Sequence, residues 1–86
     1  FIETDMTNVL KEEIKEILQT LHEDVDFEAE QTLVDGKILD SFDLVTLVTE
    51  LGEAFDINIT AKDFVVENFN SLERLTKMVL RLADEE

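Results

Sequence analysis

Residues 39–57 read LDSFDLVTLVTELGEAFDI and contain the clearest helical pattern of the chain. Large apolar side chains recur there at spacings of three and four residues, which is the period of one face of an α-helix. These side chains are Leu44, Leu47, Val48, Leu51 and Phe55. On a helical wheel they fall within an arc of roughly 100°, which is wide enough to face a core. The pattern predicts a helix from Ser41 to Phe55.

The same helix carries a second, narrower stripe. Phe42, Val45 and Thr49 follow one another at i, i+3 and i+7, away from the core side chains. A helix in so small a domain cannot bury both sides, so we expect Phe42 and Val45 to be partly exposed. Glu50 and Glu53 lie beside them, and an apolar strip ringed by carboxylates indicates a partner-binding surface. The alternative is that Phe42 folds back under the preceding loop.

Another helix is predicted from Thr7 to Leu21. Its apolar residues, again at helical spacing, are Val9, Leu10, Ile14, Ile17, Leu18 and Leu21. Residues 22–40 are too polar and irregular for a long helix, and so long a loop needs anchors in the core. We expect the anchors to be Phe27, Leu33, Val34, Ile38 and Leu39. Asp35-Gly36 indicates a turn.

Two capping patterns predict the remaining helices. Thr60-Ala61-Lys62-Asp63 has the form of a capping box and predicts the start of a short helix. Asn70-Ser71-Leu72-Glu73 has the same form and predicts the start of a last helix. The inner side of that helix is Leu72, Leu75, Val79 and Leu82, with Met78 beside it. The chain is therefore predicted to be all-α, with four helices, a long loop between the first two and a short third helix.

Length and charge narrow the function classes. The 86 residues, enough for one domain, include 22 acidic and 7 basic ones, for a net charge of −15. Such a surface repels nucleic acids and anionic membranes and favours basic protein partners. No apolar run approaches the ~20 residues of a membrane span, and no signal-peptide pattern opens the chain. We therefore expect a cytoplasmic monomer without a membrane span.

The first five residues carry no clear pattern. Met6 would serve as a natural start, so residues 1–5 are interpreted as a leader or an expression remnant, and residues 6–86 as the domain.

Neither a metal site nor an active site is predicted. Acidic residues alternate at Asp24, Asp26, Glu28 and Glu30, as at the first positions of an EF-hand loop. Ala29 replaces the glycine of such a loop and Asp35 its final bidentate Glu, so we expect no dedicated calcium site. The single histidine, His22, follows the first helix, where a helix C-terminal cation or a solvated residue is typical. Without Cys or a Ser-His-Asp set, no catalytic residues are expected.

Ser41 has two interpretations at the start of its predicted helix. Ser and Asp both accept hydrogen bonds from the unpaired amides there, so Asp40 or Ser41 would cap the helix. Alternatively, the Ser41 hydroxyl is modified, because a phosphate ester would face unpaired N–H groups and the positive end of the helix dipole. The other serine, Ser71, is explained as part of a helix start.

A longer pattern surrounds Ser41. It comprises Asp35-Gly36-Lys37-Ile38-Leu39-Asp40-Ser41-Phe42-Asp43-Leu44-Val45, then Leu47-Val48, Leu51 and Phe55-Asp56-Ile57, and later Phe69-Asn70-Ser71-Leu72-Glu73-Arg74-Leu75. Together these residues resemble the acyl carrier protein family, and the likeness extends from Val9 to Leu82. The resemblance implies a four-helix bundle and a non-catalytic carrier domain over residues 6–86.

The resemblance also implies the chemistry. A separate phosphopantetheinyl transferase would attach 4'-phosphopantetheine from coenzyme A to Ser41, and the thiol of this arm would hold acyl groups as thioesters. The pathway implied is fatty acid or related lipid and polyketide biosynthesis. Asp40 and Asp43 would contact the transferase. Basic patches on acyl- or aminoacyl-loading and acyl-transfer enzymes would meet a recognition helix through Phe42, Val45, Thr49, Glu50 and Glu53.

Two departures keep other cargoes open. Leu39 stands where many fatty-acid carriers have a small residue, and Phe42 stands where they have Leu. Leu39-Asp40-Ser41-Phe42 is also similar to D-alanyl carriers of cell-wall teichoic acid synthesis, so a D-alanyl or other aminoacyl carrier is the first alternative. The second alternative is an unmodified acidic adaptor, which the same strip and charge would serve.

Overall fold

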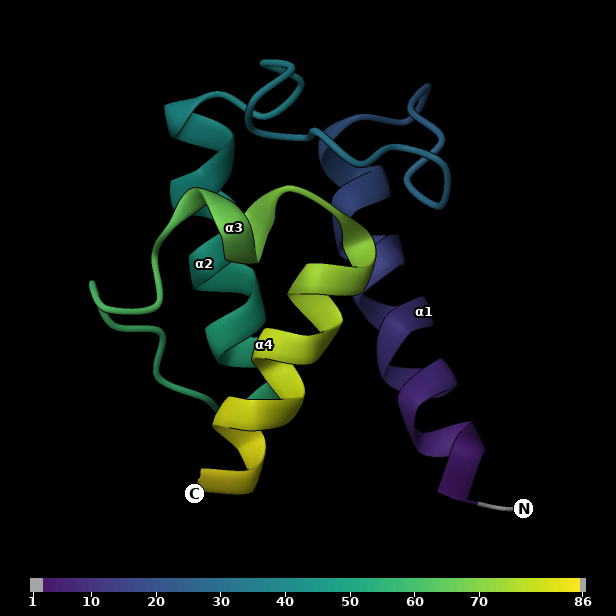
Figure 1. The fold of residues 1–86 in the computed structure, drawn as a ribbon, viewed down its shortest axis with the longest axis vertical. Coiled ribbons are helices and arrows are strands. Elements are labelled where there is room, and N and C mark those ends of the chain that lie inside the picture. Colours follow the sequence, from purple (N-terminus) through teal and green to yellow (C-terminus); the bar gives the residue numbers. More distant parts are fainter. Residues whose placement is uncertain (1–2, 86) are drawn as a thin grey trace.

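Residues 3–85 form four helices joined by loops (Figure 1). The computed structural model describes the backbone of residues 3–85 and the side chains of residues 7–84. The helices are α1 (Glu3–Leu21), α2 (Ser41–Phe55), α3 (Val66–Phe69) and α4 (Leu72–Glu85). No strand occurs within residues 3–85, and the all-α prediction is confirmed.

The boundaries of α1 and α2 follow the helical periodicity closely. α2 runs from Ser41 to Phe55, as predicted. α1 ends at Leu21, as predicted, but it begins at Glu3 and not at Thr7. Its first turn therefore includes part of the segment interpreted as a leader or remnant. That interpretation stays a prediction, and residues 1 and 2 lie outside the described residues.

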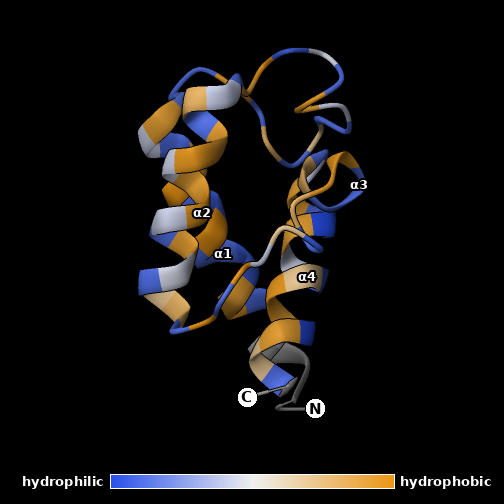
Figure 2. Ribbon diagram, turned by 90° about the vertical axis from the view of Figure 1, so that its left-hand side faces the viewer, coloured by the Kyte–Doolittle hydropathy of each residue, from blue (hydrophilic) through white to orange (hydrophobic). Residues whose placement is uncertain are grey.

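The core lies between α1, α2 and α4. α4 contacts each of the other three helices, and hydrophobic residues recur along α2 and α4 with hydrophilic ones between them (Figure 2). Fully buried residues include Ile14, Leu18, Leu47, Leu51, Leu75 and Val79. The placement of Val9 in the inner stripe of α1 is wrong, because Val9 is 54% exposed. The first turns of α1 diverge from α4 (Figure 1).

The loop of residues 22–40 is anchored in this core. Phe27, Leu33 and Leu39 are buried, and Val34 and Ile38 pack against the same cluster in a partly buried state. The predicted anchors are therefore confirmed.

The predicted turn at Asp35-Gly36 is also present. The N–H of Gly36 donates to the carbonyl oxygen of Thr32 at 2.7 Å, and a Cβ on Gly36 would lie 2.7 Å from that oxygen. Glycine is thus required for close approach of the two backbone segments. Gly36 itself does not have a positive φ; the residue of this turn with a left-handed backbone conformation is Lys37, whose φ is 62°.

The predicted start of the third helix is wrong. The Thr60 hydroxyl does not accept an amide; it lies 3.4 Å from the Asp63 carboxylate, to which it donates. Residues 60–64 form a turn, and Val65, with φ −126° and ψ 155°, is extended. The helix begins only at Val66 and ends at Phe69. The capping box fails because the Asp63 side chain is held elsewhere.

An ion pair holds Asp63 and fastens this turn to α4. Arg81 Nη2 donates to Asp63 Oδ1 at 2.8 Å, and the Asp63 side chain is only 6% exposed. The hydrogen bond from Arg81 holds the pKa of Asp63 below its ordinary value, against the opposing effect of burial. The carboxylate is therefore ionised at neutral pH.

Asp63→Asn is expected to lower the free energy of unfolding by about 1–3 kcal/mol at neutral pH, because it removes a charged hydrogen-bond partner of Arg81. The difference from the wild type should shrink in acid. A carboxylate with a depressed folded pKa contributes stability above its unfolded pKa of about 4, and that stability is lost as the pH falls through the folded pKa. Urea unfolding of both proteins over this pH range measures the effect.

The pair between Lys15 and Glu28 is a matched control, with the same N–O separation of 2.8 Å at an exposed position. Glu28→Gln should change stability little, because exposed ion pairs contribute little. Equal losses in Glu28→Gln and Asp63→Asn would contradict a special role for the buried carboxylate, as would a loss in Asp63→Asn that does not depend on pH.

The start of α4 also differs from its predicted cap. The Ser71 hydroxyl accepts a hydrogen bond from the N–H of Arg74 at 3.1 Å, so Ser71 is the cap and Asn70 is not. The inner side of α4 is confirmed, since all five predicted core side chains are buried: Leu72, Leu75, Met78, Val79 and Leu82.

Candidate functional site

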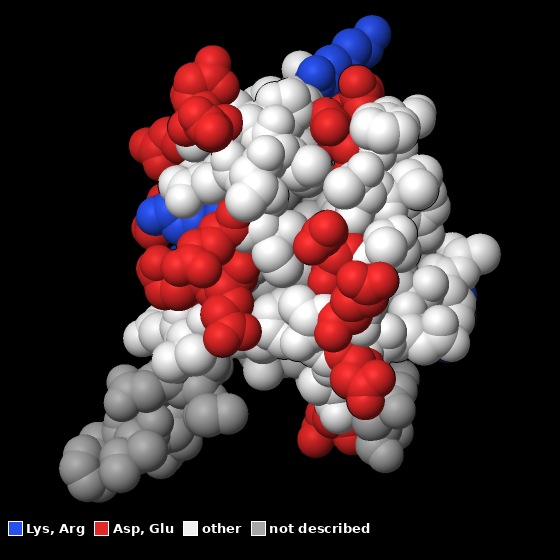
Figure 3. Space-filling view, turned by 180° about the vertical axis from the view of Figure 1, so that it is seen from behind, with Lys and Arg blue, Asp and Glu red and all other residues white. Residues whose placement is uncertain are grey.

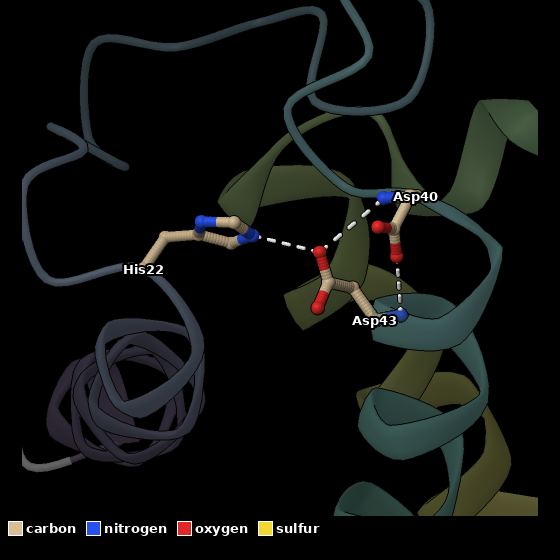
Figure 4. Close-up of polar contacts among 3 residues, drawn as sticks. All are labelled: His22, Asp40 and Asp43. Atoms are coloured by element: carbon tan, nitrogen blue, oxygen red, sulfur yellow. Dashed lines mark hydrogen bonds and ion pairs between the residues drawn. The ribbon is translucent and has the colours of Figure 1, made fainter.

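Asp40 and Asp43 form a reciprocal cap around Ser41 at the start of α2. The N–H of Asp43 donates to Asp40 Oδ1 at 2.8 Å, and the N–H of Asp40 donates to Asp43 Oδ2 at 3.3 Å (Figure 4). Such a capping box satisfies two backbone donors that the helix itself leaves unpaired. Of the two residues that could cap the helix, Asp40 is therefore the cap.

Ser41 is the first residue of α2, and its side chain is exposed. Because Asp40 makes the cap, the Ser41 hydroxyl is left without a hydrogen-bond partner among residues 7–84. A phosphate on this hydroxyl would lie beside the first-turn N–H groups and the positive end of a 15-residue helix. The residues at this end of α2 therefore fit a phosphate ester.

His22 reaches the same cap from the end of α1. Its Nε2 lies 2.7 Å from Oδ2 of Asp43, and the two residues are 21 positions apart in the chain (Figure 4). A carboxylate only accepts hydrogen bonds, so Nε2 carries the proton. His22 follows the last residue of α1, as predicted, but the interpretation of its side chain as merely solvated is wrong. No local sequence signal indicated the contact with Asp43.

The contact with His22 also affects the charge of Asp43. The hydrogen bond from His22 is the main cause that holds the pKa of Asp43 below its ordinary value, and the N–H of Asp40 acts in the same direction. Partial burial opposes both. Asp43 is therefore an ionised carboxylate that already has two donors.

The strip on α2 is exposed, as predicted. Phe42 is 78% exposed and Val45 is 60% exposed, so Phe42 does not fold back under the loop. Thr49, Glu50 and Glu53 are exposed as well, as is Asp40. Asp43 differs from the other predicted contact residues, because its side chain is only 15% exposed.

An apolar groove of about 240 Å³ adjoins this strip. It lies between α2 and the segment that leads to α3. Its lining residues are Val45, Val48, Thr49, Ile59, Thr60, Ala61 and Phe64. Among the described residues, α3 contacts α4 and not α2.

Most of the charged side chains on the face opposite that of Figure 1 are acidic (Figure 3). They form two rows down this face, and Lys and Arg side chains are visible at only a few places (Figure 3). A shallow groove between α1 and α2 is flanked by Glu13 and Glu16 on one side and Glu50 on the other. The negative charge that would attract basic partners is thus spread over both α1 and α2.

Asn70 clamps the loop that leads to Ser41. Its Oδ1 accepts hydrogen bonds from the N–H groups of Val34 and Asp35 at 3.0 and 3.1 Å, and its carbonyl oxygen accepts from the N–H of Leu33 at 2.7 Å. Its Nδ2 donates to Asp35 Oδ2 at 2.9 Å. Asn70, which precedes α4, therefore holds three successive residues of the loop, Leu33 to Asp35.

Asn70→Ala is expected to lower the free energy of unfolding by about 1–3 kcal/mol, because two backbone N–H groups lose their acceptor. Urea unfolding measures the loss, and hydrogen exchange at Val34 and Asp35 should become faster. Asn58→Ala is the control, since Asn58 is exposed and outside the clamp. Unchanged exchange at Val34 and Asp35 would show that Asn70 does not hold the loop.

The described residues contain neither a metal-binding cluster nor a membrane-spanning helix. Within residues 7–84, no group of three or more His, Asp or Glu side chains is arranged to hold a metal ion. None of the helices within residues 3–85 is long and apolar enough to cross a bilayer.

Comparison with known proteins agrees with the geometry at the start of α2. The profile of the family described as "Phosphopantetheine attachment site" matches residues 8–79. No solved structure matches the chain significantly.

Curated relatives cover most of the chain. It is 32% identical over 74 residues to the D-alanyl carrier protein of Streptococcus sanguinis (strain SK36), which is 85% of this chain and 94% of that protein. It is 31% identical over 78 residues to the D-alanyl carrier protein of Lactobacillus delbrueckii subsp. bulgaricus (strain ATCC BAA-365 / Lb-18), or 90% and 98% of the two chains.

These matches confirm the resemblance to carrier proteins. Members of this family are in general non-catalytic, and they interact with a phosphopantetheinyl transferase and with acyl-transfer enzymes. The chain belongs to the phosphopantetheine attachment-site family and is a carrier protein with a covalently attached 4'-phosphopantetheine.

Proposed function

We propose that Ser41 is the attachment point of the 4'-phosphopantetheine and that the protein carries its cargo there as a thioester. The observation that supports this most directly is the exposed Ser41 hydroxyl at the first position of α2, with the cap made by Asp40. Ser71, the other serine, is buried, and its hydroxyl caps α4. Only one of the two serines is accessible for esterification.

The residues around Ser41 determine how the arm is presented. When bound, the arm supplies a thiol, which a chain without Cys does not have. The capping box orders the backbone on both sides of Ser41, and the exposed Phe42 begins the apolar strip beside it. An enzyme that covers this strip is brought next to Ser41.

Six side chains form the proposed docking surface for the transferase and the loading and acyl-transfer enzymes. They are Asp40, Phe42, Val45, Thr49, Glu50 and Glu53, all of which are exposed. Their apolar and acidic character is complementary to a hydrophobic contact surrounded by basic residues.

D-alanine, or another small aminoacyl group, is the cargo that we propose first. The relatives that cover most of this chain are D-alanyl carrier proteins. The cargo first implied by the resemblance, a fatty acid or polyketide intermediate, is the second candidate. The groove of about 240 Å³ beside α2 supports it, because its lining is mostly apolar and suits a hydrocarbon chain.

The test begins with the purified protein, a promiscuous phosphopantetheinyl transferase and coenzyme A. Intact mass should show the addition of one arm, and fragmentation should place it on Ser41. The loaded protein is then offered to a D-alanine-adenylating enzyme with ATP, and separately to an enzyme that transfers apolar acyl groups. Formation of a D-alanyl thioester alone would support the first cargo, and an acyl thioester alone the second.

A chain that accepts no arm would overturn the proposal and leave the acidic adaptor as the remaining interpretation. An arm found on any residue other than Ser41 would also overturn it. Ala61→Phe distinguishes the two cargoes further. Ala61 lines the groove, so this larger side chain should hinder an apolar acyl group and leave D-alanyl loading unchanged.

A further inference from the structure

We propose that His22 is a positioning residue for the modification of Ser41, and that it acts by holding Asp43 in the capping box. This inference rests on the proposed function of Ser41. It assigns a role to a side chain that is distant in sequence from the motif and is not itself expected to touch coenzyme A.

His22 lies where the end of α1, the following loop and the start of α2 meet. Asp43 Oδ2 accepts from His22 Nε2 at 2.7 Å and from the N–H of Asp40 at 3.3 Å (Figure 4). The shorter bond therefore comes from His22, the residue that follows α1, and the longer one from within the capping box. His22 is itself held in place, because its backbone N–H donates to the carbonyl oxygen of Leu18 at 3.0 Å.

The hydrogen bond between His22 and Asp43 links the start of the loop of residues 22–40 to the helix that follows the loop. The first turn of a helix is the part that frays most readily, since its amides lack intrahelical partners. Here the orientation of Asp43 decides whether the N–H of Asp40 is satisfied, and Asp40 in turn caps Asp43. By fixing one carboxylate oxygen, His22 orders the residues on both sides of Ser41.

The same contact changes the expected role of Asp43. Its side chain is 15% exposed and already has two donors, whereas Asp40 and Phe42 are exposed. Asp43 is thus an internal brace of the site, and Asp40 is the carboxylate that a transferase can reach. For a transferase that binds only the ordered start of α2, the apparent Kd equals the intrinsic Kd divided by the fraction of molecules in which that start is ordered, so fraying weakens binding.

The test compares His22→Gln with His22→Asn. The Gln side-chain amide reaches the position of Nε2 and can donate to Asp43, whereas the Asn amide is one methylene shorter and cannot. The KM of a phosphopantetheinyl transferase for the apo protein should rise about 3- to 10-fold in His22→Asn, because one hydrogen bond to a charged group is lost. The kcat should be unchanged, and His22→Gln should stay close to the wild type.

Val25→Ala is the control for a merely structural effect. Val25 packs partly buried against the core and is not part of the hydrogen bonds of the capping box. Val25→Ala should lower the free energy of unfolding and leave the KM of the transferase unchanged. An unchanged KM in His22→Asn would overturn the proposal, and so would equal increases in His22→Asn, His22→Gln and Val25→Ala.

Hydrogen exchange at the amide of Asp43 separates this inference from the proposed function. Exchange should be faster in His22→Asn than in the wild type and His22→Gln, whether or not an arm is attached. A wild type that accepts no arm would overturn the function of Ser41, whereas equal exchange rates in all variants would overturn the role of His22.

Discussion

Ser41→Ala is expected to abolish the attachment of 4'-phosphopantetheine completely, because it removes the hydroxyl oxygen that we propose as the site of the ester. The start of α2 should otherwise be preserved. Asp40 and Asp43 make the capping box without the Ser41 hydroxyl, and alanine is a favourable helix residue. Intact mass after incubation with a transferase and coenzyme A measures the result, and circular dichroism checks the helix content.

Ser71→Ala is the control with the opposite expectation. It removes the hydroxyl that accepts from the N–H of Arg74, and loss of such a cap costs about 1 kcal/mol of stability. It should nevertheless accept one arm, because Ser41 is unchanged and the buried Ser71 is not the proposed attachment point. An arm on Ser41→Ala, or a folded Ser71→Ala without one, would contradict the assignment.

Phe27→Ala should lower the free energy of unfolding by about 3–5 kcal/mol, the usual cost of removing a buried aromatic side chain. Phe27 is 1% exposed and anchors the long loop in the core. That loss is a large part of the total for a domain of this size, so the variant should be unfolded in part at ambient temperature. Urea unfolding followed by circular dichroism measures it, and Phe27→Leu should retain much of the stability.

Phe42→Ala is the matched control, with the same change of side chain at an exposed position of the motif. Phe42 is 78% exposed, so its removal should change stability little. It should instead raise the KM of the transferase, because the side chain lies in the proposed docking strip. Equal loss of stability in Phe27→Ala and Phe42→Ala would contradict the packing described here.

The parts of the fold that could be predicted are those that depend on local periodicity. The spacing of Leu44, Leu47 and Leu51 gives α2 with its correct ends, and apolar residues in an otherwise polar loop identify Phe27 and Leu33 as anchors. The exposure of Phe42 also followed from local geometry, since a helix of this domain has only one side to bury.

The parts that could not be predicted depend on contacts between distant residues. Asp63 reads as the end of a capping box with Thr60, but Arg81 lies 18 positions further on and takes its carboxylate. Asn70 reads as a cap for α4, but its side chain is bound to a loop 35 and 36 positions earlier. In both cases the side chain that the local motif assigns to a helix cap forms its hydrogen bonds with a distant partner instead.

By itself the sequence determined the all-α class, the extent of α2, the acidic character of the surface and the serine that could hold an ester. Helical spacing and charge are properties of neighbouring residues, so they can be read along the chain. Only the tertiary structure decided that Asp40 makes the cap, that His22 braces Asp43 and that Asn70 holds the preceding loop. Each polar side chain has several partners of suitable chemistry, and packing determines which of them lies within hydrogen-bonding distance.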